Sequence, residues 1–285
     1  MNIIKKINIL YKEIQLLKKK QKIIGLIPTM GNLHEGHIQL MLLSKKYIDI
    51  LVVSIFINPM QFENLLDFKK YPKTLSKDLK ILKKENVDIV FIPKISEIYP
   101  NGFKKHTYIQ VPKLSKIIEG QSRPGHFIGV TTIIGKLFNL IQPNFSFFGE
   151  KDYQQLLIIK TVVKELNYPI KIISLPTIRL KTGLAFSSRN KYLNNLELKK
   201  APLLYKTINT TINNIIHTKG KKINTIILNS KKNLIKNGFL IDIFNVYNAK
   251  TLDNFSIKNK INILLASVWL GKTRLIDNKK FILPN

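Results

Sequence analysis

The chain has 285 residues, of which 45% are hydrophobic, and it contains no cysteine. Without thiols, disulfide scaffolds and cysteine-ligated zinc or iron–sulfur sites are excluded, and the high apolar fraction excludes a disordered basic tail. The formal net charge is +30, and the length allows one large domain or two modest ones, since domains usually have about 100–200 residues.

The first twenty residues carry apolar side chains at helical spacing, from Ile4 to Leu17. Lysines and Glu13 interrupt this stretch, so it predicts an ordinary amphipathic helix and no export signal. The purely apolar stretches further along the chain fall far short of the ~20 residues that a membrane-spanning helix needs. We therefore expect a cytoplasmic protein without a membrane partner.

From residue 23 to about residue 175, short β-rich runs alternate with longer helical ones. The first three are a strand at 23–27, a helix at 36–47 and a strand at 48–57, which form a βαβ unit and imply a parallel sheet. The pattern continues with helices at 75–84, 130–141 and 154–166 and strands at 87–92, 145–148 and 170–173. This alternation predicts a doubly wound, Rossmann-like α/β domain, in which ligands bind beyond the carboxyl ends of the strands.

The regular alternation of strand-like and helical runs ends after Pro176. A turn-rich segment at 182–190 is followed by polar helices interrupted at Gly220 and Gly238, and then by strand-like runs at 241–246 and 261–268. We expect two domains, residues 1–177 and a smaller α+β domain of residues 178–285.

The first candidate motif, PTMGNLHEGH at residues 28–37, lies between the first predicted strand and the helix after it. His34 and His37 are three residues apart, so they share one face at the helix N-terminus, where unpaired backbone N–H groups already favour an anion. Gly31 and Gly36 allow a ligand to approach the backbone closely. The motif predicts a phosphate site with two imidazole donors. Capping histidines are the simpler alternative, and a zinc site is a weaker one, because no third ligand is evident.

The second motif is the end of the strand at 48–57, where Asn58 and Gln61 supply two amides. Amides in this position can bind carboxylate or hydroxyl groups with fixed geometry. A simple turn around Pro59 explains the segment equally well.

The third motif, GEKDYQQ at residues 149–155, follows the strand at 145–148 and opens a helix. Lys151 at this junction can neutralise a phosphoryl oxygen, and Gln155 lies three residues after Asp152. The simpler alternative is an ordinary helix start with Asp152 as its first-turn acid.

The fourth motif, AFSSRN at residues 185–190, offers two hydroxyls and a guanidinium that suit the outer phosphates of a nucleotide. Only four of the 47 basic residues are arginine, and they stand at positions 123, 179, 189 and 274. In a chain so rich in lysine, an arginine marks a place where a planar fork is required. Arg189 falls inside this motif, and Arg123 falls inside EGQSRPGHF at residues 119–127, a segment that we group with the third motif.

Taken together, these segments resemble the pantothenate synthetase (pantoate–β-alanine ligase) family of HIGH-type nucleotidyltransferases. The resemblance covers nearly the whole chain, and besides the motifs above it includes YPKTLSKDL, EGQSRPGHF and LASVWLGKTRLIDN. It implies an ATP- and Mg²⁺-dependent ligation in which the carboxylate of pantoate attacks the α-phosphate and releases diphosphate. The amine of β-alanine then attacks the pantoyl adenylate, giving pantothenate and AMP. A homodimer is also implied.

The resemblance assigns roles to individual residues. His37 is the catalytic donor, with His34 and Lys151 acting at the phosphates, and Gln61 and Gln155 hold pantoate. The ligands of the metal are not assigned. The implied ATP-binding residues are Met30, Gly31, Asn32, Leu33, His34, Glu35, Gly36, His37, Gly149, Glu150, Lys151, Asp152, Ile178, Phe186, Ser187, Ser188 and Arg189. Residues 1–177 then bind ATP and pantoate, and residues 178–285 carry the Ser-Ser-Arg-Asn loop as a lid.

Two positions depart from the family pattern. Phe186 stands where the family usually has Met, and Ile128 stands where a basic residue is common. We expect Phe186 to alter the packing around the adenine and to leave the chemistry intact.

The charge of +30 suggests a different function, a basic nucleic-acid-binding protein. Its lysines, however, are scattered as singles and pairs from Lys5 to Lys280, with one triplet at residues 18–20. A dedicated binder would cluster them among aromatics or arginines. We therefore expect no specific nucleic-acid partner. Another HIGH-type nucleotidyltransferase, including a synthetase that charges RNA, is the remaining alternative, but the residues after 190 show no RNA-binding appendage.

Overall fold

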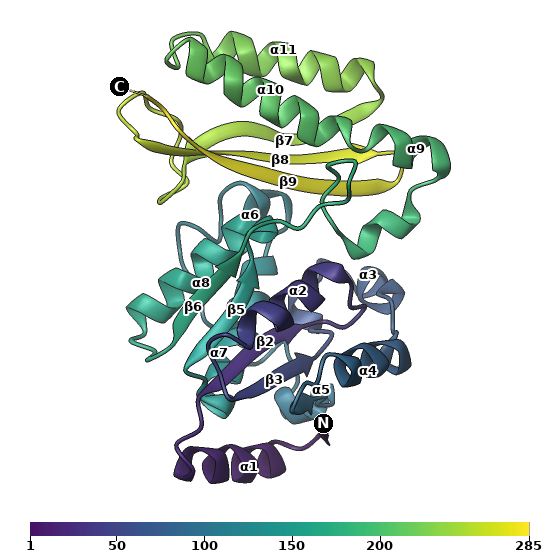
Figure 1. Cartoon of the computed structure of the whole chain (residues 1–285), viewed down its shortest axis with the longest axis vertical. Coiled ribbons are helices and arrows are strands. Elements are labelled where there is room, and N and C mark those ends of the chain that lie inside the picture. The colour runs from purple at the N-terminus through teal and green to yellow at the C-terminus, as the bar shows by residue number, and fades with distance from the viewer. Residues whose placement is uncertain (285) are drawn as a thin grey trace. The chain divides into compact units, whose positions relative to one another are not determined.

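A six-stranded parallel sheet organises the N-terminal part of the computed structural model, which describes residues 1–284 apart from the side chain of Leu65. Its strands are β1 (Asn2–Ile4), β2 (Ile24–Thr29), β3 (Ile50–Ile55), β4 (Ile89–Phe91), β5 (Phe145–Gly149) and β6 (Lys171–Leu175). The strand order is β1-β4-β3-β2-β5-β6, and each neighbouring pair runs parallel. Figure 1 labels β3, β2, β5 and β6 of this sheet.

Helices connect these strands. They are α1 (Ile7–Lys19), α2 (Glu35–Ser44), α3 (Leu65–Lys70), α4 (Leu75–Lys84), α5 (Ile95–Ile98), α6 (Glu119–Ser122), α7 (His126–Ile141) and α8 (Tyr153–Glu165), with the 3₁₀ turns η1 (Pro59–Gln61) and η2 (Glu150–Asp152).

Successive residues of the central strands enter two separate cores, one on each face of the sheet. Leu26 and Val52 pack in a cluster with residues of α1 and α7, whereas Ile27 and Val53 pack in a cluster with residues of α2 and α4. This follows from the two-residue period of a strand, and it explains why both faces of these strands are apolar. The doubly wound α/β fold expected from the sequence is confirmed.

The predicted elements differ from the observed ones mainly at their ends. The helix predicted at 75–84 has the bounds of α4, but the helix predicted at 130–141 begins four residues earlier, at His126. There Gly125 adopts a left-handed conformation, with φ of 78°, and forms the N-cap. The short strand β1 was not predicted, since its three residues run directly into the pattern of α1.

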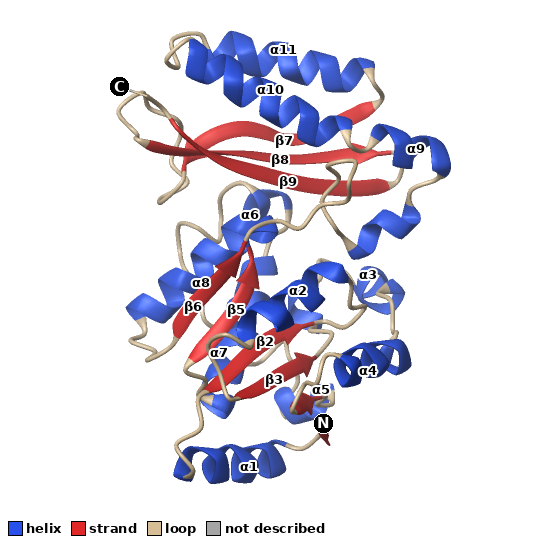
Figure 2. Cartoon of the chain, viewed as in Figure 1, coloured by secondary structure: helices blue, strands red, loops and turns tan. Residues whose placement is uncertain are grey.

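A second, antiparallel sheet lies in the C-terminal part of the chain. Its strands are β7 (Phe239–Asn248), β8 (Ile261–Leu270) and β9 (Thr273–Ile282), in that order. Helices α10 (Leu203–His217) and α11 (Ile223–Lys236) cover one face of it, as Figure 2 shows, and α9 (Asn195–Lys200) and η3 (Ser188–Tyr192) precede them. Strand β9 was not predicted, because lysines and other polar residues interrupt its apolar alternation.

The chain divides into two compact units. One comprises Met1–Glu150 and Gln154–Pro176, and the other comprises Lys151–Tyr153 and the residues from Thr177 onward. In the part of the chain that the structure describes, no helix combines the length and the apolar character needed to cross a membrane.

Candidate active site

The order of strands creates a switch point between β2 and β5. From β2 the chain continues to β3 on one side, whereas β5 lies on the other side of β2 and leads on to β6. In open α/β sheets, ligands bind at such a point beyond the carboxyl ends of the strands. The segment that begins with Met30 follows β2, and Glu150 follows β5. Both therefore leave the sheet at the edge where a ligand is expected.

A buried carboxylate accepts hydrogen bonds from the backbone of the turn after β2 and fixes its conformation. Gly31 and Asn32 both have positive φ, at 75° and 52°, so two consecutive residues are left-handed. Asp78 of α4 accepts hydrogen bonds from the backbone N–H groups of Asn32 and Leu33, each at 2.9 Å, and from the Thr74 hydroxyl at 3.0 Å. Its side chain is 1% exposed. Asp78 of α4 thus fixes the backbone conformation of the loop at Asn32 and Leu33.

Replacing Asp78 by asparagine is expected to lower the free energy of unfolding by about 1–3 kcal/mol. The amide has one oxygen acceptor instead of two, so at least one of the buried N–H donors of the loop loses its acceptor and faces an NH2 group. The substitution should also raise the KM for ATP. The checks are urea unfolding and steady-state kinetics. Asp88→Asn is a suitable control, because the exposed Asp88 carboxylate accepts from the backbone N–H of Leu51. Equal effects of the two substitutions would contradict this role for Asp78.

The two histidines form a capping box at the start of α2. His34 is the N-cap, and its Nδ1 accepts from the N–H of Gly36 at 3.1 Å. Nδ1 of His37 accepts from the N–H of His34 at 3.3 Å, and the ring centroids are 4.2 Å apart. A Cβ on Gly36 would lie 3.0 Å from the His34 ring, so glycine permits this close packing.

The capping box also determines the tautomer of both rings. Because each Nδ1 accepts a hydrogen bond from a backbone N–H, the proton of each neutral imidazole is on Nε2. His34 and His37 therefore both present Nε2–H donors at the N-terminus of a helix, where the dipole favours negative charge. The sequence left capping and anion binding as alternatives, and this geometry is compatible with both at once.

Gln61 of η1 lies beside the loop after β2. Its Nε2 contacts Met30 Sδ at 2.8 Å, its Oε1 accepts from Asn58 Nδ2 at 3.2 Å, and its side chain is 9% exposed. The structure therefore brings together Met30, expected at the nucleotide, and Gln61, expected at pantoate.

Asn58 has a structural role. Its Nδ2 donates to the carbonyl of Gly129, and its Oδ1 accepts from the hydroxyl of Tyr99 at 2.8 Å. Burial raises the pKa of Tyr99, which keeps the hydroxyl protonated as a donor. Asn58 is 1% exposed, it donates both amide hydrogens, to Gly129 and Gln61, and its Oδ1 accepts from the N–H of Met60 as well as from Tyr99, so we do not expect it to bind substrate. The Gln61 amide makes one contact at each end, which leaves one N–H and one lone pair for a ligand.

His126, the first residue of α7, contacts the main chain of Gln61. His126 Nδ1 lies 2.8 Å from the carbonyl oxygen of Gln61 and must donate to it, so its Nε2 accepts from Arg123 at 3.1 Å. A Cβ on Gly129 would lie 2.5 Å from the backbone of Met60, so only glycine allows this contact. His126 was not a candidate in the sequence, although its motif belongs to the family resemblance. Arg123 acts on the site through His126.

The segment after β5 contributes residues to both units. In the first unit, Glu150 accepts from the Ser174 hydroxyl at 3.1 Å, and Gln155 lies half-buried in the first turn of α8. The neighbouring Gln154 is 1% exposed, and its Nε2 donates to the carbonyls of Leu114 and Ile117. Of the two adjacent glutamines, Gln155 is therefore the one available to a ligand.

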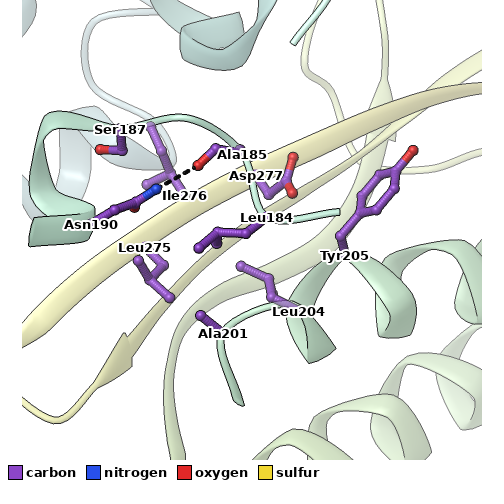
Figure 3. Close-up of a pocket in the computed structure, with 10 residues that line it drawn as sticks. All are labelled: Leu184, Ala185, Ser187, Asn190, Ala201, Leu204, Tyr205, Leu275, Ile276 and Asp277. Atoms are coloured by element: carbon purple, nitrogen blue, oxygen red, sulfur yellow. Dashed lines mark hydrogen bonds between the residues drawn. The ribbon is translucent and has the colours of Figure 1, made fainter. Parts of the chain in front are cut away.

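The Ser-Ser-Arg-Asn segment lies in the second unit. The N–H of Phe186 donates to the carbonyl of Ile178 at 2.9 Å, so it is used within the loop, and Ser187 Oγ accepts from the N–H of Arg189 at 3.2 Å. Figure 3 shows the pocket behind this segment, whose lining includes Leu184, Asn190 and Tyr205. Its free volume of about 10 Å³ holds about one water molecule, so it is not the nucleotide pocket.

Among residues 1–284, no group of three or more His, Asp or Glu side chains could hold a metal ion.

Comparison with known proteins gives a consistent result. The sequence profile of the pantoate-beta-alanine ligase family matches residues 2–280. The chain is 70% identical over 283 residues to the pantothenate synthetase of Buchnera aphidicola subsp. Schizaphis graminum (strain Sg), and the match covers 99% of both chains. It is 67% identical, with the same coverage, to that of Buchnera aphidicola subsp. Acyrthosiphon pisum (strain 5A).

Solved structures agree with the sequence relatives. The pantothenate synthetase of Thermus thermophilus has a TM-score of 0.87 and 34% identity, covering 98% of this chain and 99% of its own. The pantoate-beta-alanine ligase of Francisella tularensis, complexed with beta-gamma ATP and beta-alanine, has a TM-score of 0.80 and 34% identity, covering 99% of this chain and 97% of its own.

Proposed function

The chain belongs to the pantoate–β-alanine ligase family, and from this premise we propose that it joins pantoate to β-alanine through a pantoyl adenylate formed from ATP. The observation that carries this proposal is that Nδ1 of His34 and Nδ1 of His37 both accept from backbone N–H groups at the N-terminus of α2, beside the switch point of the sheet, which makes Nε2 the donor of each neutral ring. The complex of the Francisella tularensis relative supports ATP and β-alanine as substrates.

In the first step, a carboxylate oxygen of pantoate attacks the α-phosphorus of ATP. The bond from that phosphorus to the bridging oxygen breaks, and diphosphate leaves with the electron pair. Negative charge grows on the phosphoryl oxygens, and fixed donors aimed at such charge can each contribute about 3–4 kcal/mol. His37 is the main donor in this proposal, and His34 assists it. The backbone from Met30 to Leu33 lies against the nucleotide.

Lys151 and the Ser187–Arg189 segment neutralise the β- and γ-phosphates as diphosphate forms. A lysine supplies a point charge, whereas Arg189 supplies a planar fork and the serines supply hydroxyl donors. Gly149, Glu150, Asp152, Ile178 and Phe186 complete the proposed nucleotide-binding set. Mg²⁺ enters with ATP as part of the substrate, and it neutralises phosphate charge when bound.

Gln61 and Gln155 hold pantoate in this proposal. An amide can donate to a carboxylate and accept from a hydroxyl, which matches the groups of a hydroxy acid. Asn58 orients the Gln61 amide before substrate arrives, and His126 holds the main chain of Gln61 through its carbonyl. Such positioning lowers the barrier to attack, because the orientational entropy of the carboxylate is already lost when pantoate binds.

In the second step, the amine of β-alanine attacks the acyl carbon of the adenylate. The bond from that carbon to the AMP oxygen breaks, the nitrogen loses one proton, and pantothenate and AMP are released. Neither step requires a covalent enzyme nucleophile. The two-domain division at residue 177 stays a prediction from the sequence pattern, and the homodimer stays a prediction from the resemblance. Light scattering tests the dimer.

An assay of AMP and diphosphate with and without β-alanine tests the proposal. We expect sustained formation of both only with ATP, Mg²⁺, pantoate and β-alanine together. Without β-alanine we expect a burst of diphosphate no larger than the enzyme concentration, because the adenylate stays bound. Sustained diphosphate release that needs no pantoate, or product release as ADP and phosphate, would contradict the proposal.

A further inference from the structure

The TRLIDN segment at the end of the sequence has no role in the chemistry described so far. Its last two residues, Asp277 and Asn278, lie side by side in β9 and are 4% and 8% exposed. Polar side chains at this depth need hydrogen-bond partners. The partner of Asp277 is Arg179, at the base of the hairpin that leads to the proposed phosphate-binding segment Ser187–Arg189, and the partner of Asn278 is Lys151.

Asp277 forms a buried ion pair with Arg179. Both oxygens of the carboxylate are used, at 2.6 Å from Nη1 and 2.7 Å from Nη2 of the guanidinium. The side chains of Asp277 and Arg179 are 3% and 17% exposed, and Arg179 Cζ lies 3.4 Å from the ring centroid of Tyr205. A planar guanidinium can pair at its edge and stack on its face at the same time, which a lysine cannot do.

Arg179 also holds the hairpin that leads to Ser187. Arg179 pairs with Ala185 in an isolated antiparallel bridge, and its Nη1 donates to the carbonyl of Gly183 at the tip, at 3.1 Å. Gly183 has a positive φ of 93°, and a Cβ there would lie 3.2 Å from the ring of Tyr205. The base and the tip of the hairpin are therefore both tied to β9 through one side chain.

The segment after the hairpin continues these contacts. Asn190 Nδ2 donates to the carbonyl of Ala185 at 3.0 Å, and Figure 3 shows this bond as a dashed line between the two residues. The residues from Ser187 to Arg189 lie between these two anchored positions. Their conformation consequently depends on where Asp277 places the hairpin.

Asn278 holds the second segment. Its Nδ2 donates to the carbonyl oxygen of Lys151 at 2.8 Å. Tyr153 is tied to the same unit, since its hydroxyl donates to the carbonyl of Ala249 at 2.7 Å and its ring lies 5.7 Å from Nζ of Lys280. Because neighbouring strand residues point to opposite faces, Asp277 and Asn278 reach the two segments from opposite sides of the sheet.

We propose that Asp277 and Asn278 are positioning residues of the nucleotide site. Asp277 sets the Ser187–Arg189 segment through Arg179, and Asn278 sets Lys151 through its main-chain carbonyl. This proposal rests on the proposed function, because it requires that these two segments contact the phosphates of ATP. Two neighbouring residues of one strand then fix the spacing between a lysine and an arginine that bind the same triphosphate.

The test compares Asp277→Asn, Arg179→Lys and Asn278→Ala with Asp242→Asn. The control breaks an ion pair of the same sheet, in which Arg274 Nη2 lies 2.7 Å from Asp242 Oδ2. We expect each of the first three variants to lower kcat/KM for ATP by about tenfold to a hundredfold, since small misplacements of catalytic groups have effects of this size. The KM for β-alanine should change less than about twofold, and Asp242→Asn should leave all constants within about twofold of wild type.

Amide hydrogen exchange of the same full-length proteins supplies a readout that does not depend on activity. Asp277→Asn and Arg179→Lys should speed exchange in residues 179–190 and leave residues 151–153 unchanged, whereas Asn278→Ala should do the reverse. If Asp277→Asn does not fold, Arg179→Lys and Asn278→Ala decide the matter.

The outcomes separate the two proposals. An inactive wild-type protein with the expected exchange pattern would overturn the proposed function and support only the anchoring of the segments. An active wild type whose Asp277 and Asn278 variants match Asp242→Asn in kinetics and in exchange would overturn the positioning role.

Discussion

Replacing His37 by glutamine is expected to lower the rate of AMP formation at least about a hundredfold while the protein stays folded. In the structure, Nδ1 of His37 accepts from the N–H of His34, and this leaves the proton of the neutral ring on Nε2, the atom that is proposed to donate to phosphate. Glutamine is a common partner at this position of a capping box, so its side-chain oxygen can replace Nδ1. Its NH2 group is also a donor, but a flexible side chain carries it, whereas the rigid imidazole ring holds Nε2–H in a fixed place across from Nδ1. The loss of one fixed donor of this kind costs about a hundredfold to a thousandfold in kcat.

Single-turnover formation of AMP and thermal unfolding of the same variant make the measurement. His217→Ala is the matched control, because His217 is exposed in the last turn of α10. A His37→Gln variant with the melting temperature and the rate of wild type would show that His37 only caps the helix.

Replacing Lys151 by methionine is expected to lower kcat/KM for ATP at least about a hundredfold, which is about 2.7 kcal/mol of transition-state stabilisation. Methionine keeps most of the apolar stem and removes the charge. The main chain should keep its place, because the contact from Asn278 is made to the carbonyl of Lys151. A loss of activity would then report the ammonium group itself.

Lys160→Met controls for the general field of the protein. Lys160 is an exposed residue of α8, and either substitution lowers the net charge of +30 by one. If ATP were attracted by the charge of the whole surface, both variants would bind ATP equally less tightly than wild type. High salt would then remove the difference between each variant and wild type. We expect Lys160→Met to stay within about twofold of wild type at each salt concentration.

Hydrophobic periodicity predicted much of the fold, because the parallel strands are buried on both faces and the helices between them are amphipathic. The run that became β3 and the pattern that became α4 are examples. Strand β9 was missed for a physical reason. Its polar residues Asp277 and Asn278 are buried against partners elsewhere in the sequence, so no alternation of apolar and polar residues marks the strand.

The candidate site was predictable where chemistry is local in sequence. His34 and His37 are close neighbours, and their position after a strand points to an anion site. The contacts that shape the loop are not local. Asp78 binds Asn32 across 46 residues of sequence, and Asp277 binds Arg179 across 98. Such pairs come together only through the topology of the sheets, which the spacing of residues cannot reveal.

The arginine count carried more information than the net charge. Arg179 was set apart in the sequence only by its rarity, and the structure gives a reason for it, since the guanidinium pairs with Asp277 and stacks on Tyr205 at once. The lysines, by contrast, are mostly interchangeable as charges, and Lys151 is distinguished by its place at the end of β5.

Pantoate is proposed to be activated as an adenylate, and the transfer of a carboxylate oxygen to AMP is the direct test of this step. Pantoate labelled with ¹⁸O in its carboxylate is incubated with ATP, Mg²⁺ and β-alanine, and the products are analysed by mass spectrometry. Attack of the carboxylate on the α-phosphorus predicts one ¹⁸O in each AMP released and none in diphosphate. Label found in diphosphate or in inorganic phosphate, with unlabelled AMP, would contradict the mechanism.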